Sequence, residues 1–116
     1  MEQLQGNKYA QYVKESYGRE YYETEEGFIT YSFPSTMSGV CVIHALWIEP
    51  AKRQSHRGSE LADRVAEKAR EREASSLFCE IDTRSQTYKE ALNAITNYGF
   101  KIIGTSGFYV MLQKDI

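Results

Sequence analysis

The feature that most constrains the fold is an apolar run, Val40 to Ile48, that is followed by Pro50. Nine residues with His44 as the one side chain that titrates near neutral pH are typical of a buried strand, and proline cannot continue the hydrogen bonding of a central strand. After a short basic segment, apolar residues recur every four positions, which predicts an amphipathic helix that begins near Gly58. The region therefore predicts a strand, a loop and a helix in immediate succession.

Similar patterns predict the remaining elements. A four-residue spacing of aromatic and apolar side chains predicts a helix at 8–17, and a turn containing Gly27 predicts a β-hairpin between strands at 20–24 and 28–33. Downstream, the patterns predict a strand at 77–81, a helix at 88–98 and two final strands at 100–103 and 108–113.

The resulting order of elements is α-β-β-β-α-β-α-β-β. A chain of 116 residues is long enough for one hydrophobic core, so we predict a single domain over residues 1–116. Strand–helix–strand units in the middle of the chain predict an α/β (α+β) fold with a mixed, partly parallel central sheet and helices on both faces.

Alternation along strand 40–48 predicts which side chains share a face of the sheet. One face would carry Val42, His44, Leu46 and Ile48, and the other Cys41, Ile43, Ala45 and Trp47. Cys41 would then point away from His44, so a Cys–His nucleophile pair is not expected. Both cysteines, Cys41 and Cys79, are instead predicted to be buried free thiols.

Composition and charge argue against several classes of function. The formal net charge is −2, so no overall field favours nucleic acid, and no such partner is expected. The sequence has no apolar run of about 20 residues, and its polar N-terminus is unlike a signal or transit peptide. No Cys or His spacing suits zinc, so no metal site is predicted. We therefore expect a cytoplasmic protein without a membrane partner.

The loop between strand 40–48 and the following helix could bind an anion. A helix start leaves backbone N–H groups without intrahelical partners, and Lys52, Arg53 and Arg57 add positive charge nearby. Gly58 would let a phosphate approach the backbone closely. An ordinary loop with solvated cations explains the local residues equally well.

Four short motifs occur in an order and spacing that point to a known family. Residues 46–50 read L-W-I-E-P, and residues 53–58 read R-Q-S-H-R-G. Residues 88–91 read Y-K-E-A, and residues 98–101 read Y-G-F-K. These motifs resemble the L-x-V-x-P strand end, the R/Q-x-x-G-x-G/A loop, the N-x-x-A helix and the Tyr, G-F pattern of the GCN5-related N-acetyltransferase (GNAT) family. The resemblance covers roughly residues 20 to 114.

The resemblance implies an acyl-CoA N-acyltransferase fold and acetyl-coenzyme A (acetyl-CoA) as a co-substrate. In that family the loop holds the pyrophosphate, and backbone N–H groups of the preceding strand polarise the thioester carbonyl. The residues so implied at the cofactor site are Trp47, Ile48, Arg53, Gln54, Ser55, His56, Arg57, Gly58, Ser59 and Tyr88.

Two residues are candidates for catalysis. His44 can act as a base near neutral pH, and residues 44–46 look like the H-A-L stretch of aralkylamine acetyltransferases. A buried neutral histidine with a structural hydrogen bond is the alternative. Tyr98 is the tyrosine nearest to the family's catalytic position, which Ile95 occupies here, so Tyr98 is the candidate acid, with packing as its alternative.

Two functions remain open. The first is an N-acetyltransferase that transfers an acetyl group from acetyl-CoA to an amine, either a small amine or a protein lysine. The second is a catalytically degenerate scaffold or interaction protein within a larger assembly, because Ile95, His56 and Tyr88 replace a tyrosine, a glycine and an asparagine of the family pattern. The family's first strand is not apparent, and the shortened sheet edge could pair with another copy or a larger assembly.

The acceptor itself is not readable from the sequence, but one surface suggests a type of acceptor. The resemblance implies that the acceptor lies against the N-terminal helix and the hairpin, where Tyr21, Tyr22, Glu23, Glu25 and Glu26 cluster. An acidic, aromatic surface would suit a cationic amine. An acidic solvated turn explains the same residues.

Overall fold

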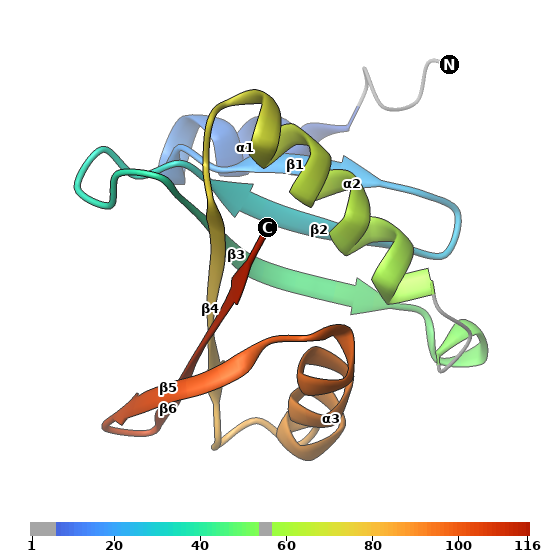
Figure 1. Cartoon of the computed structure of the whole chain (residues 1–116). Helices are drawn as coiled ribbons and strands as arrows, with labels where there is room; N and C mark the ends of the chain where they lie inside the picture. Colours follow the sequence, from blue (N-terminus) through green and yellow to red (C-terminus); the bar gives the residue numbers. More distant parts are fainter. Residues whose placement is uncertain (1–6, 54–56) are drawn as a thin grey trace.

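The computed structural model describes residues 7–53 and 57–116, and the predicted order of elements is confirmed (Figure 1). A short 3₁₀ helix after the third strand, η1 (Pro50–Lys52), was not predicted. The elements are α1 (Lys8–Tyr17), β1 (Glu20–Glu23), β2 (Gly27–Ser32), β3 (Val40–Ile48), α2 (Arg57–Glu71), β4 (Ser76–Asp82), α3 (Tyr88–Tyr98), β5 (Lys101–Ser106) and β6 (Tyr109–Asp115).

The strands form one six-stranded mixed sheet in the order β1-β2-β3-β4-β6-β5. The β3–β4 pair is parallel and the other neighbouring pairs are antiparallel, as expected when α2 forms the crossover between β3 and β4. The prediction of a mixed, partly parallel sheet is therefore confirmed.

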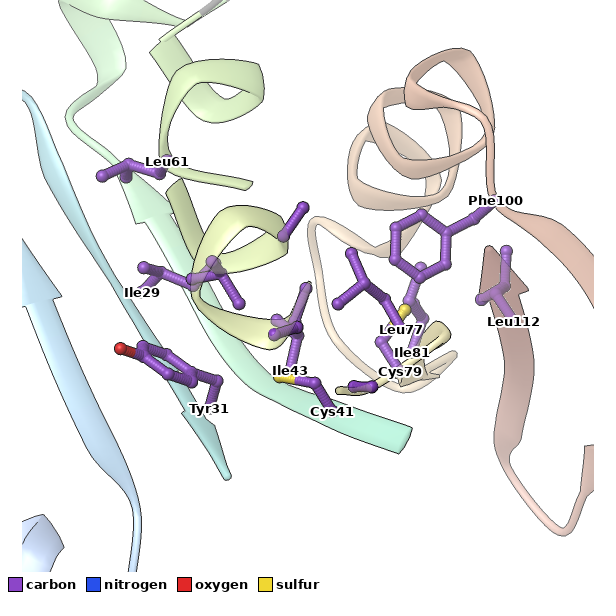
Figure 2. Close-up of a cluster of buried hydrophobic side chains, with 14 of the residues drawn as sticks. Ile29, Tyr31, Cys41, Ile43, Leu61, Leu77, Cys79, Ile81, Phe100 and Leu112 are labelled. Carbon is purple, nitrogen blue, oxygen red and sulfur yellow. The ribbon is translucent and has the colours of Figure 1, made fainter. Parts of the chain in front are cut away.

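Helices α2 and α3 cover one face of this sheet, and α1 lies against the other (Figure 1). The first face holds the core, in which Leu61 and Val65 of α2 pack with Ile29 of β2 (Figure 2). Tyr9 of α1 instead contacts Phe28, whose side chain alternates with that of Ile29 and so points to the opposite face.

Both cysteines lie in this core as free thiols, as predicted. Cys41 is fully buried and Cys79 nearly so, and burial raises the pKa of each thiol to about 12. Such thiols stay protonated at neutral pH and act as small apolar side chains.

A β-bulge in β3 changes the predicted distribution of its side chains. Tyr31 of β2 pairs with Ile43, but Thr30 pairs with Ala45, so His44 is an extra residue on β3. An extra residue reverses the alternation beyond it. Before the bulge the buried side chains are Cys41 and Ile43, and beyond it they are Leu46, which packs against the core, and Ile48.

The prediction that Val42, His44, Leu46 and Ile48 share one face was therefore wrong. His44 bonds to Ser32, whose side chain points away from the α2 face, whereas Ile48 packs on the α2 face. The bulge places the histidine on the face of the sheet that α1 occupies.

The sheet opens between β3 and β4. Their pairing includes only Val40–Ile43 of β3 and Ser76–Cys79 of β4. Beyond these residues β3 continues to Ile48 and remains paired with β2, while β4 continues to Asp82 and remains paired with β6. The two strands diverge visibly toward their C-terminal ends (Figure 1). The opening is thus a wedge between two strands that are each supported on their outer side.

Candidate functional site

The start of α2 lies beside the open end of β3. A β-carbon placed on Gly58 would lie 3.7 Å from Leu46 Cδ2 and 3.9 Å from Ile48 Cγ1, so the first turn of the helix packs directly on β3. Gly58 and Ser59 are both half-buried there. The positive end of the helix dipole therefore lies next to the opening.

Arg53, which follows η1, forms a hydrogen bond back to the end of β3. Its Nε donates a 2.8 Å hydrogen bond to the carbonyl oxygen of Ile48, and this bond does not use the two terminal guanidinium nitrogens. Arg57 is the first residue of α2. The predicted cofactor residues Gln54, Ser55 and His56 lie outside the described residues, so their predicted roles stay predictions.

Beyond Ile43, the edge of β3 that faces the opening has no strand partner in the part of the chain that the structure describes. Apart from the Ile48 carbonyl oxygen, which accepts the bond from Arg53, backbone groups along this edge are therefore not used in strand pairing. This arrangement is consistent with the predicted contact between the β3 backbone and a thioester carbonyl.

His44 lies at the bulge, on the same strand as that edge. Its Nε2 is 2.7 Å from Ser32 Oγ. Partial burial, and to a lesser extent the positive charge of Arg19, lower the pKa of His44 below its usual 6.5. The imidazole is therefore neutral at pH 7 and can accept a proton.

The Ser32 contact links the tautomer of His44 to the nitrogen that can act as the base. If Nε2 donates its hydrogen to Ser32 Oγ, Nδ1 carries the free lone pair, and the opposite tautomer leaves a protonated Nδ1. Sequence reasoning did not find Ser32, and no local pattern could have revealed it. The two residues meet because the bulge turns His44 toward β2.

Trp47 is 46% exposed and lies on the same face of the sheet as His44, nearer the end of β3. Its ring stacks on Phe28 at 6.2 Å with 26° between the planes, and Phe28 stacks on Tyr21 at 5.4 Å with 19°. We call Trp47, Phe28 and Tyr21 the aromatic row. Three adjacent strands each contribute one ring to it.

Tyr98 forms a link between the two helices of the core face. Its hydroxyl donates a 2.6 Å hydrogen bond to Asp63 Oδ1 on α2, and its ring lies 6.1 Å from that of Phe100. Burial, followed by the bond to Asp63, raises the pKa of Tyr98 above 10. A phenol held in this way is a weaker acid than a free one, so these contacts favour a structural role.

Tyr88 and Ile95, which occupy the family's asparagine and tyrosine positions on α3, also contact the core. Tyr88 is the first residue of the helix, and both Tyr88 and Ile95 are partly buried against the core cluster. The Ile95 side chain supplies no hydroxyl at the position where the family pattern has one.

Two surface hollows of ≈ 260 and ≈ 270 Å³ lie at the other end of α2, and both include Phe33 and Arg72 in their lining. No predicted site residue lines either of them. Among the described residues, no group of three or more His, Cys, Asp or Glu side chains is arranged to hold a metal. No helix within residues 7–53 and 57–116 is long and apolar enough to cross a membrane.

A family model decides the identity of the domain. The model of the acetyltransferase (GNAT) family matches residues 10–100, which is most of the chain. The chain belongs to the GNAT family. No curated protein sequence matches the chain.

Solved structures of GNAT-type enzymes share the fold. An acetyltransferase from Thermus thermophilus has a TM-score of 0.75 and 12% identity, and the match covers 91% of this chain and 70% of that protein. A GNAT-family acetyltransferase from Staphylococcus aureus has a TM-score of 0.71 and 14% identity, with coverage of 90% and 74%.

A third structure contains a cofactor. PaiA N-acetyltransferase from Thermoplasma acidophilum, crystallised in complex with coenzyme A, has a TM-score of 0.68 and 14% identity. The match covers 78% of this chain and 54% of that protein, so this chain spans about half the length of that relative. At these identities the likeness establishes the GNAT fold rather than a substrate.

Proposed function

We propose that this protein is an N-acetyltransferase that transfers the acetyl group of acetyl-CoA to an amine. The observation that carries the proposal is the opening between β3 and β4, with the start of α2 on one side and His44 on the opened strand. Membership of the GNAT family supports the reaction class, and the coenzyme A complex of a structural relative supports the co-substrate.

The residues around the opening suit a pyrophosphate and a thioester. In this proposal the first turn of α2, with Gly58 and Ser59, holds the pyrophosphate together with Arg53. The pantetheine arm enters between β3 and β4, where backbone N–H groups near Trp47 and Ile48 are positioned for the thioester carbonyl. Tyr88, at the start of α3, lines the other side.

His44 removes the proton from the attacking amine. Its lowered pKa keeps it neutral at pH 7, and its bond to Ser32 holds the ring, with Nδ1 as the accepting atom when Nε2 carries the hydrogen. The nitrogen then forms a bond to the acetyl carbonyl carbon, the carbon–sulfur bond breaks, and coenzyme A leaves as a thiolate that takes up a proton from solvent or from the protonated imidazole. In this proposal Tyr98 holds α3 against α2 through Asp63 rather than acting as the acid.

The second candidate is a GNAT-fold scaffold that has lost catalysis. The specific observation in its favour is Ile95, an apolar side chain packed against the core at the family's tyrosine position. Such a protein would bind acetyl-CoA weakly or not at all, so cofactor binding separates the two candidates.

Thermal-shift and calorimetric titration with acetyl-CoA tests the proposal. A ligand at about 100 times its dissociation constant stabilises the folded state by ~2.7 kcal/mol. Arg53→Ala should weaken binding about fivefold, as expected for one exposed charged contact. Lys101→Ala, which removes the same charge from the exposed strand β5, is the matched control and should leave affinity unchanged. No stabilisation at millimolar acetyl-CoA would overturn the enzyme proposal.

A further inference from the structure

The face of the sheet that carries His44 also carries an oriented carboxylate at its far corner. Glu23 of β1 pairs with Phe28 of β2, which in turn pairs with Trp47 of β3, so the three residues form one row across the sheet. The next row on the same face of the sheet contains Tyr21, Thr30 and Ala45, and His44 lies at the bulge beyond Ala45. A line from His44 to Glu23 therefore crosses the sheet diagonally over Thr30.

Glu23 is held in place by neutral donors. Its Oε1 accepts a 2.9 Å hydrogen bond from the Tyr21 hydroxyl and a 2.8 Å bond from Asn7 Nδ2. Burial, followed by the bond to Glu23, raises the pKa of Tyr21 to about 12, so this phenol remains a donor at neutral pH. Within residues 7–53 and 57–116 no Lys or Arg forms an ion pair with Glu23.

Charge differs between the two ends of this diagonal. Glu25 and Glu26 form the turn after Glu23, and Glu49 follows β3 at the same end, with its N–H bonded to the Glu26 carbonyl oxygen at 2.8 Å. Arg19 lies at the opposite end, where its charge acts on His44. A neutral amine is favoured near His44 and Arg19, whereas an ammonium group is favoured near Glu23.

The surface between these ends can hold an alkyl chain. Trp47 is 46% exposed and shares the aromatic row with Phe28 and Tyr21, so methylene groups and cations can pack on it. Thr30, which lies beneath the diagonal, is 2% exposed, so the alkyl chain would pass beside it, along Trp47 and Phe28.

We propose that the acceptor is a linear amine with a second positive charge, of the diamine or polyamine class. This inference rests on the proposed acetyl transfer and specifies its acceptor. The reacting nitrogen lies at His44, the alkyl chain follows the aromatic row, and the distal ammonium group binds Glu23. Strand spacing and residue rise place the two ends on the order of 10 Å apart. Long diamines should therefore bind better than short ones.

Trp47 is the single tryptophan of the chain, so its fluorescence reports binding at this surface without any need for turnover. Butane-, hexane- and octanediamine, with hexylamine as the singly charged control, would be titrated at low ionic strength. Octanediamine should bind at least about fivefold more tightly than hexylamine, which is the effect of one exposed ion pair. Glu23→Gln should abolish this preference, and Glu67→Gln, on the exposed face of α2, should preserve it.

The outcomes separate the two proposals. Equal binding of diamine and monoamine, or a preference that survives in Glu23→Gln, would overturn the diamine inference, and acetylation of hexylamine in the same samples would show that acetyl transfer still stands. A preference that depends on Glu23 supports the inference. If no amine is then acetylated in the presence of acetyl-CoA, the proposed reaction fails although the cation site has been found. Tight binding of a lysine peptide but of no diamine would also overturn the diamine inference.

Discussion

The two long edges of β3 have opposite properties. Toward β2, pairing extends from Val42 to Ile48 and includes the bulge at His44. Toward β4, pairing stops at Ile43 and the rest of the edge is open. One strand thus combines a side supported by β2, which orients His44 and Trp47, with a side that has no strand partner beyond Ile43 among the described residues. Rigid support and access are provided by different neighbours, so a substitution can disturb one without the other.

The largest effect should come from the supported side. A β-carbon on Gly27 would lie 2.0 Å from the Trp47 carbonyl oxygen and 2.9 Å from Ile48 Cα, and backbone atoms cannot move away easily. Gly27→Ala should therefore reduce the free energy of unfolding by about 3 kcal/mol or more. Urea denaturation measures this loss.

Gly18→Ala is the control for that substitution. Gly18 has φ +67° but no neighbour within 4 Å of an added β-carbon, so the cost should be about 1 kcal/mol of backbone strain. Equal losses in the two variants would mean that the close β2–β3 contact is not what fixes the end of β3.

The second effect concerns the base. His44→Ala should lower kcat about 100-fold, the usual contribution of a general base, and leave acetyl-CoA affinity within about twofold. Steady-state kinetics and calorimetry measure the two quantities. Ser32→Ala, which removes the partner of Nε2 but keeps the imidazole, should cause a smaller loss of kcat. A loss of cofactor affinity in His44→Ala would show that the residue supports the strand rather than the reaction.

Tyr98 offers a test of the assignment of roles around the opening. Tyr98→Phe removes the hydrogen bond to Asp63 and should reduce the free energy of unfolding by about 1 kcal/mol, with kcat within twofold of the parent. Thermal denaturation and an acetyl-transfer assay measure these. A large fall in kcat with unchanged stability would restore Tyr98 as the acid.

The smallest effect should be a shift in pH dependence. Because the pKa of His44 is lowered by burial and by Arg19, the acid limb of kcat/KM should have its midpoint below pH 6.5. Arg19→Gln removes the electrostatic part, so the folded-state pKa should rise and the limb should move to higher pH. Lys101→Gln is the control and should not move it. A shift to lower pH would contradict the assignment of this limb to His44.

The elements were predictable because each depends on local pattern. Alternating and four-residue spacings identified β3 and α2, and both cysteines were correctly expected as buried free thiols. The family resemblance, carried by residues 46–50, 53–58, 88–91 and 98–101, is confirmed by the family model over residues 10–100. Part of the predicted site, residues 54–56, lies outside the described residues.

What was missed depends on contacts between distant segments. The prediction of which β3 side chains share a face was wrong because the bulge at His44 arises from the pairing of β3 with β2. The hydrogen bond between Tyr98 and Asp63 arises from the packing of α3 beside α2, and 35 positions separate the two residues. Neither sequence spacing nor residue type records such contacts.

The sequence by itself determined the order of strands and helices, the position of the α2 start after Pro50, and the type of residue that could serve as a base. These follow from the period of the apolar pattern and from side-chain chemistry within a few neighbouring residues. Only the tertiary structure decided that His44 faces α1 rather than α2, that Ser32 holds it, and that β3 and β4 separate beyond Ile43. Pairing between strands sets those three features, because register and strand divergence are properties of two segments together.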